Sequence, residues 1–194
     1  MFWSQITIPG KPRILMLDAS RNTQGWEAEF CDRVFNVLSR KKVEIADGKL
    51  LRVHSPQDLG EALQDKQGFN CILLFCHGQG PQVRQEFGLG AFWTSLSKHE
   101  ALSPKLVAVC TWETDDPETT ERILAADDTF APLAVVPQSP LSPRTAGLFF
   151  MKFFTELDLH AHDSMTGKMV WFSHSKAREI LRRRNLPGVV GLRC

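Results

Sequence analysis

Two short apolar runs, NCILLFC at 70–76 and LVAVC at 106–110, most constrain what this chain can fold into. A strand with one face in water alternates apolar and polar residues, whereas these runs are apolar at almost every position. Strands of this kind occur where helices cover both faces of a parallel sheet. The first run stops at HGQG, which makes His77 the first residue of a predicted loop, and the second run ends at Cys110.

The rest of the chain continues this alternation of strands and helices. Further strands are predicted at 13–17 (ending at Asp18 and Ala19), within 49–54, at 133–136 and at 189–192. Helices are predicted at 23–38, from Ser55 onward, and at 91–102, 117–126, 142–157 and 164–184. The pattern predicts an α/β fold with a mostly parallel sheet of about six strands and helices on both faces. We expect a single domain over 1–194, with its core at about 13–192.

Charge and hydropathy exclude several classes of function. The net charge of +1 and the pI of about 7.7 do not describe a polyanion binder, so no nucleic-acid partner is expected. The run Arg182, Arg183 and Arg184 falls near the end of a predicted helix, where cations suit the helix dipole. No segment is long and apolar enough to span a bilayer, and the N-terminus does not resemble a secretory leader. These features predict a cytoplasmic protein with no membrane partner.

The cysteine and histidine pattern argues against disulfides and metals. Five cysteines are an odd number, no CxxC pair occurs, and the six histidines are scattered. We therefore expect free thiols in a reducing compartment and neither a metal nor a cofactor. Cys71 and Cys76 lie within the first apolar run and are predicted to be core thiols. A nucleotide domain of flavodoxin-like form ranks last, because the stretch DASRNTQGW after the first strand contains no glycine-rich phosphate loop.

Three polar or reactive residues are predicted to meet at one edge of the sheet. Asp18, His77 and Cys110 each follow or end a strand, and parallel strands bring their carboxyl ends together. A thiol needs a nearby base to become a nucleophile, and His77 could take that proton. The N–H groups of Gly78 and Cys110 could then stabilise an oxyanion. The pattern alone leaves a second reading open, in which Cys110 is a buried structural thiol.

The order of an apolar strand with His-Gly after it, a crossover helix and a strand ending in Cys resembles the caspase-like cysteine peptidases. Within that group the stretches LLFCHG and LVAVCTWET are most similar to the CHAT branch. The resemblance implies a caspase-like fold in which Cys110 is the nucleophile, His77 the general base and Gly78 part of the oxyanion hole, without a third catalytic residue. Thr111 and Trp112 depart from the Glu-Thr-Gly that typically follows the nucleophile.

The same resemblance implies where the substrate pocket lies. Positions two before the histidine and two before the cysteine often line it, and here they are Phe75 and Ala108, with Asp18 as the remaining charged candidate. The sequence thus predicts a cysteine endopeptidase that cleaves a protein or peptide substrate and is activated by a regulatory or sensor chain. The alternative is a catalytically inactive caspase-like module that acts in protein–protein assembly.

Overall fold

The computed structural model describes residues 6–19, 26–63, 68–77, 94–95, 104–112, 133–139, 141–188 and 190–193. Its strands, in chain order, are β1 (Thr7–Pro9), β2 (Arg13–Ala19), β3 (Glu44–Arg52), β4 (Cys71–His77), β5 (Leu106–Trp112), β6 (Leu133–Pro137), β7 (Ser164–Thr166) and β8 (Val190–Arg193). The main helices are α1 (Trp26–Arg40), α2 (Pro56–Leu63), α5 (Pro143–His160) and α6 (Gly167–Arg183). The helices predicted at 91–102 and 117–126 lie outside the described residues, apart from Thr94 and Ser95.

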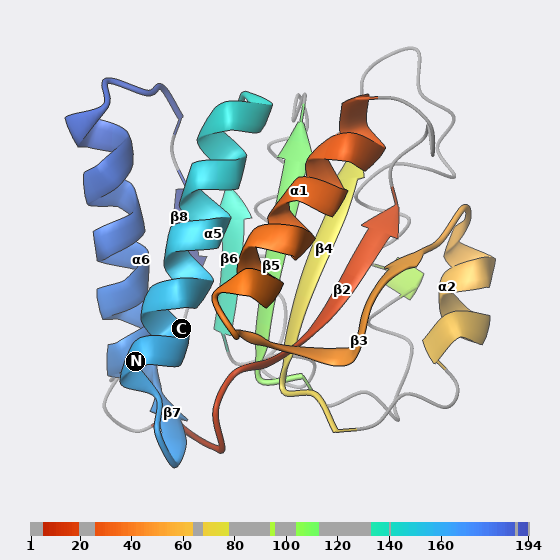
Figure 1. Ribbon diagram of the computed structural model, residues 1–194, viewed down its shortest axis with the longest axis horizontal. Coiled ribbons are helices and arrows are strands. Elements are labelled where there is room, and N and C mark those ends of the chain that lie inside the picture. Colours follow the sequence, from red (N-terminus) through yellow and green to blue (C-terminus); the bar gives the residue numbers. More distant parts are fainter. Residues whose placement is uncertain are drawn as a thin grey trace.

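The main sheet has six strands in the order β3-β2-β4-β5-β6-β8. The first five are parallel and β8 runs antiparallel to β6 (Figure 1). The predicted α/β fold with a mostly parallel sheet of about six strands is therefore confirmed. The apolar runs at 70–76 and 106–110 form the two central strands, β4 and β5, as their lack of polar positions predicted.

Helices cover both faces of this sheet. Helices α1 and α5 lie side by side across one face, with α6 next to α5, and α2 lies on the other (Figure 1). Side chains alternate along each strand, so one core contains Leu73 of β4 and the other contains Leu74. Leu59 and Leu63 anchor α2 to the second core. In the described part of the chain, no helix could cross a membrane.

Helix α5 begins where its sequence predicted. The Ser142 hydroxyl accepts a hydrogen bond from the Thr145 N–H at 3.1 Å, and Pro143 occupies the first turn. The helix then presents four buried phenylalanines to the sheet and to α6, namely Phe149, Phe150, Phe153 and Phe154. This aromatic layer makes α5 the central helix of the larger core.

Two short features were not predicted. Strand β3 begins at Glu44 rather than near 49, and it contains Asp47 and Gly48 with positive φ angles of 56° and 60°. An Asp-Gly pair is typical of a turn, but here it accompanies a shift in the register between β2 and β3. The helix predicted from Ser164 begins at Gly167 instead, since residues 164–166 pair with β1 as β7.

A histidine between α6 and β8 makes the stability depend on pH. His174 Nε2 lies 2.9 Å from the Val190 carbonyl oxygen, and its ring packs edge-on against Phe149. Burial lowers the pKa of His174; the Val190 hydrogen bond opposes this shift and nearby Arg178 adds to it. The unfolded chain therefore binds a proton that native His174 does not, and we expect the unfolding free energy to fall as the pH decreases below about 6.5.

Urea unfolding of the wild type and of His174→Gln at several pH values checks this expectation. Glutamine keeps an N–H donor within reach of Val190 but does not titrate. The variant should lose less stability than the wild type as the pH is lowered. Equal pH dependence in the two proteins would show that other groups govern the acid response.

Candidate functional site

The structure places three of the predicted site residues at one level of the sheet. Asp18, Phe75 and Cys110 are register partners across β2, β4 and β5, so they occupy the same level of three neighbouring strands. His77 lies two positions beyond Phe75, opposite Trp112. His77 is thus the last residue of β4 rather than the first residue of a loop, and β5 continues two residues past its predicted end at Cys110.

Part of the predicted site lies outside the described structure. This applies to Gly78, the predicted oxyanion donor, to the segment 113–132 after β5, and to the side chain of His77. The roles of His77 as base and Gly78 as oxyanion donor therefore remain predictions. Of the predicted site residues, the structure describes the side chains of Asp18, Phe75, Ala108 and Cys110.

Cys110 is a core residue in this structure. Its relative exposure is 0 %, and it belongs to the same hydrophobic core as Ala108 and Phe75, on the face that α1 and α5 cover. Alternation along β5 explains this, because Val107 and Val109 point to the opposite core. Burial, with a smaller contribution from Cys76, raises the pKa of the Cys110 thiol well above its ordinary value. The thiol is therefore neutral near pH 7, whereas the nucleophilic form of cysteine is the thiolate.

Asp18 is buried and paired with an arginine. It is 2 % exposed within β2, and its Oδ2 lies 3.6 Å from Arg52 Nε at the end of β3. Arg52 also donates a hydrogen bond to Asp32 of α1 at 2.7 Å. A buried carboxylate needs such a partner to offset its desolvation. The Asp18 carboxylate is thus paired with Arg52 inside the protein, beside Phe75, which is predicted to line the substrate pocket.

Cys31 of α1 completes this cluster, and sequence reasoning did not identify it. Burial raises the pKa of Cys31 above its ordinary range, and the neighbouring Asp18 and Cys110 raise it further, with Asp18 as a hydrogen-bond partner. A signal for this placement was present in the sequence. Cys31 falls between Ala28 and Val34 on the buried face of α1, at the three-residue spacing of an amphipathic helix.

The two predicted pocket residues are also fully buried. Phe75 and Ala108 are both 0 % exposed, and the Phe75 ring packs edge-on against Phe30 of α1 with centroids 6.1 Å apart. Neither lines the two cavities that lie beside α6. A substrate pocket at these positions remains a prediction.

Four described cysteines are free, buried thiols: Cys31, Cys71, Cys76 and Cys110. Burial raises the pKa of both Cys71 and Cys76 above the ordinary range, which fits the prediction that they are core thiols. Within the described ranges, no group of three or more His, Cys, Asp or Glu side chains could hold a metal ion.

Comparison with known proteins defines the class of fold. No family model matches the sequence, and no curated protein matches it either. Among solved structures, the six-stranded α/β architecture matches the caspase-like fold of a clan CD cysteine protease. One such match is the X-ray structure of an inactive zymogen C11 protease from Parabacteroides distasonis, with a TM-score of 0.57 and 11% sequence identity.

This chain spans less than two thirds of the C11 protease chain that it matches. The match covers 95% of this chain but only 62% of the C11 protease chain. At 11% identity, the likeness establishes the fold and not the activity. The expected caspase-like architecture is confirmed, while assignment to the CHAT branch remains a prediction from the motifs around His77 and Cys110.

Proposed function

We propose that this chain is a caspase-like domain that acts by binding other proteins and does not hydrolyse them, with Cys110 as a structural thiol. One observation argues against hydrolysis: the Cys110 side chain is completely buried in the hydrophobic core beneath α1 and α5. A catalytic thiol must reach a substrate carbonyl and must ionise. Each unit by which burial raises its pKa reduces the thiolate fraction about tenfold near neutral pH.

The surroundings of Cys110 support the same conclusion. Strand β5 stays paired with β4 through Trp112, so Cys110 lies inside a ladder rather than at its tip. Asp18 is engaged with Arg52, and Cys31 faces the same cluster from α1. Exposing the Cys110 sulfur would require the end of β5 to separate from helices α1 and α5, which cover this face of the sheet.

A cysteine peptidase is the second candidate. In it, Cys110 would be the nucleophile, His77 the base and Gly78 an oxyanion donor, with a protein substrate held near Asp18, Phe75 and Ala108. Two observations favour it: His77 and Cys110 lie near the same ends of adjacent parallel strands, and the fold matches that of a protease. The matched C11 protease is described as an inactive zymogen. This candidate accordingly treats buried Cys110 as a resting state that a regulatory chain would open.

Cysteine labelling tests the proposal against a dyad that works without an activator. The full chain is treated with a low dose of iodoacetamide at neutral pH, and mass spectrometry follows the rate at each cysteine in the wild type and in His77→Ala. We expect Cys110 to react no faster than Cys71, which is equally buried on the neighbouring strand. The proposal fails if Cys110 reacts much faster than Cys71 and loses that advantage in His77→Ala, because a working dyad has that signature.

A further inference from the structure

A groove runs along α6 on the side that faces β8. It consists of two adjoining cavities of about 560 and 420 Å³, which share Ser175 and Arg178 as lining residues. Arg182 and Leu186 line the first cavity, and Trp171 lines the second. We call this feature the α6 groove. It lies away from the Cys110 cluster, so nothing inferred from it depends on whether Cys110 is catalytic.

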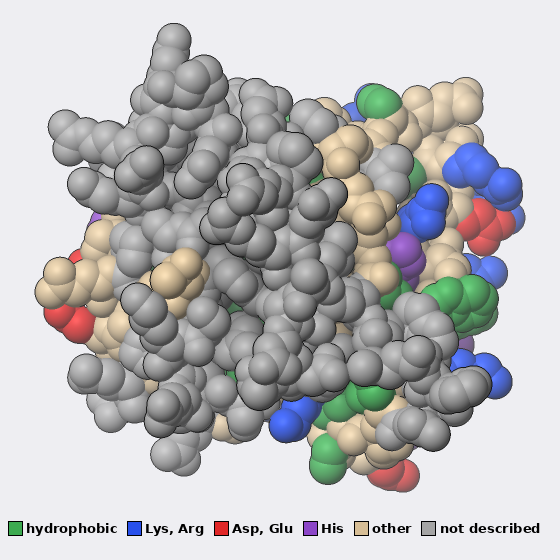
Figure 2. Space-filling model, turned by 180° about the vertical axis from the view of Figure 1, so that it is seen from behind, with side chains coloured by type: hydrophobic (Ala, Val, Ile, Leu, Met, Phe, Trp, Pro, Cys, Tyr) green, Lys and Arg blue, Asp and Glu red, His purple; other side chains and the backbone are tan. Residues whose placement is uncertain are grey.

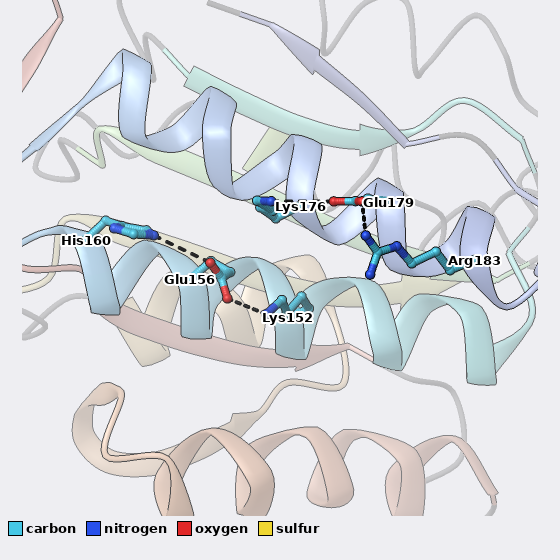
Figure 3. A network of polar contacts seen from close by, with 6 residues as sticks. All are labelled: Lys152, Glu156, His160, Lys176, Glu179 and Arg183. Carbon is cyan, nitrogen blue, oxygen red and sulfur yellow. Dashed lines mark hydrogen bonds and ion pairs between the residues drawn. The ribbon is translucent and has the colours of Figure 1, made fainter.

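The charge of the α6 groove is positive. Arg178 and Arg182 both line it and are exposed, and neither forms an ion pair with any residue that the structure describes. Glu179 also lines it, but Lys176 at 3.6 Å and Arg183 at 2.5 Å hold its carboxylate (Figure 3). Figure 2 shows Lys and Arg side chains gathered along the edge of the molecule that carries α6. The helix dipole cannot account for Arg178, which lies more than one turn before the end of α6.

Trp171 gives the other end of the α6 groove an apolar contact. It is 49% exposed, an unusual degree of exposure for a large aromatic residue. The walls of the groove are held together, because buried His174 connects α6 to the Val190 carbonyl of β8. The Gln138 side chain closes the remaining side, lying 2.7 Å from the point where a Cβ on Gly191 would stand. A ligand therefore meets a surface whose supporting elements, α6 and β8, are joined.

The spacing of these groups indicates what fits. Trp171 and Arg182 are eleven positions apart on one helix, which is about 16 Å at the helical rise. An extended peptide covers that distance with about five residues. Guanidinium groups bind carboxylates with two parallel hydrogen bonds, and an exposed indole packs against apolar side chains. We infer that the α6 groove binds an extended acidic segment of a partner protein, with Arg178 and Arg182 on its carboxylates and Trp171 on an apolar side chain.

Other partners fit the α6 groove less well. Nucleic acids are bound through many phosphate contacts, whereas this groove has two arginines without an ion-pair partner among the described residues. The whole chain has a net charge of only +1. A membrane surface is flat, whereas these residues line a concavity.

Fluorescence anisotropy of a labelled peptide tests the inference on the full chain. The probe consists of repeated Glu-Gly-Leu units, and the comparison peptide has Gln in place of every Glu. We expect Arg178→Gln combined with Arg182→Gln to weaken binding of the Glu peptide by roughly tenfold or more, since two charge-assisted contacts are lost. The matched control is Arg33→Gln with Arg40→Gln, which removes two exposed arginines from α1 and should leave affinity within about twofold. Trp171→Ala should weaken binding of both peptides.

Three results would overturn the inference. The first is equal binding of the Glu and Gln peptides, and the second is equal loss of affinity in the two double variants. The third is binding of a single-stranded oligonucleotide or of anionic lipid vesicles, but not of the peptide, through Arg178 and Arg182. The alkylation rate of Cys110 is measured separately, so the proposed function and this inference can fail independently.

Discussion

Phe149→Ala is expected to lower the free energy of unfolding by about 3 to 5 kcal/mol. Phe149 is fully buried, and its ring contacts three other rings, two on α5 and one on α6. Its ring packs edge-on against Phe150 at 5.1 Å, parallel to Phe153 at 6.0 Å, and edge-on against His174 at 5.6 Å. Truncation removes these contacts and leaves a cavity that rigid neighbours cannot fill. Urea unfolding followed by circular dichroism measures the change.

The same helix supplies the control for this experiment. Leu159 lies on α5 but is 61% exposed, so Leu159→Ala removes little buried area and should change stability by less than about 0.5 kcal/mol. If the two variants were destabilised equally, α5 would not be packed as the structure describes.

Gly188→Ala is expected to cost about 2 to 5 kcal/mol, for two reasons that act together. Gly188 has a backbone φ angle of +120°, which residues other than glycine rarely adopt. A Cβ there would also lie 2.3 Å from Leu141 Cδ2, and Leu141 is itself a core residue beside the first turn of α5. Thermal unfolding of the variant measures the combined cost.

Gly10→Ala separates the two contributions. Gly10 also has a positive φ angle, +81°, but a Cβ there would meet no atom within 4 Å. This variant should therefore show the backbone strain alone and lose less stability than Gly188→Ala. Equal losses at the two positions would mean that the contact with Leu141 relaxes without cost.

The main sheet could be predicted because its strands carry an unusual sequence signal. Residues such as Leu73 and Leu74 are both buried, one in each core, and only a strand covered on both faces needs apolar residues at consecutive positions. The start of α5 was equally clear, since Ser142 and Pro143 act within the chain segment that contains them. Strands β1 and β7 gave no such signal, because each has only three residues and depends on a partner more than 150 positions away.

The environment of the candidate site could be predicted only in part. Topology alone brought Asp18 and Cys110 to the same level of neighbouring strands. Whether Cys110 faces a groove or the core depends on how far β5 continues, and Thr111 and Trp112 gave no stop signal that fixed its end. The pairing of Asp18 with Arg52 depends on the register of β3 against β2, which the bulge at Asp47 and Gly48 shifts. Tertiary contacts of this kind are not encoded in local patterns.

That bulge has a further consequence for how copies of the protein meet in solution. Among the described strands, β3 forms one border of the main sheet. A regular border strand offers a row of amide and carbonyl groups on which another chain can extend the sheet. The positive φ angles of Asp47 and Gly48 break that row, and exposed Glu44 and Lys49 place charge on either side. The irregularity that shifts the register thus also makes this border a poor template for aggregation.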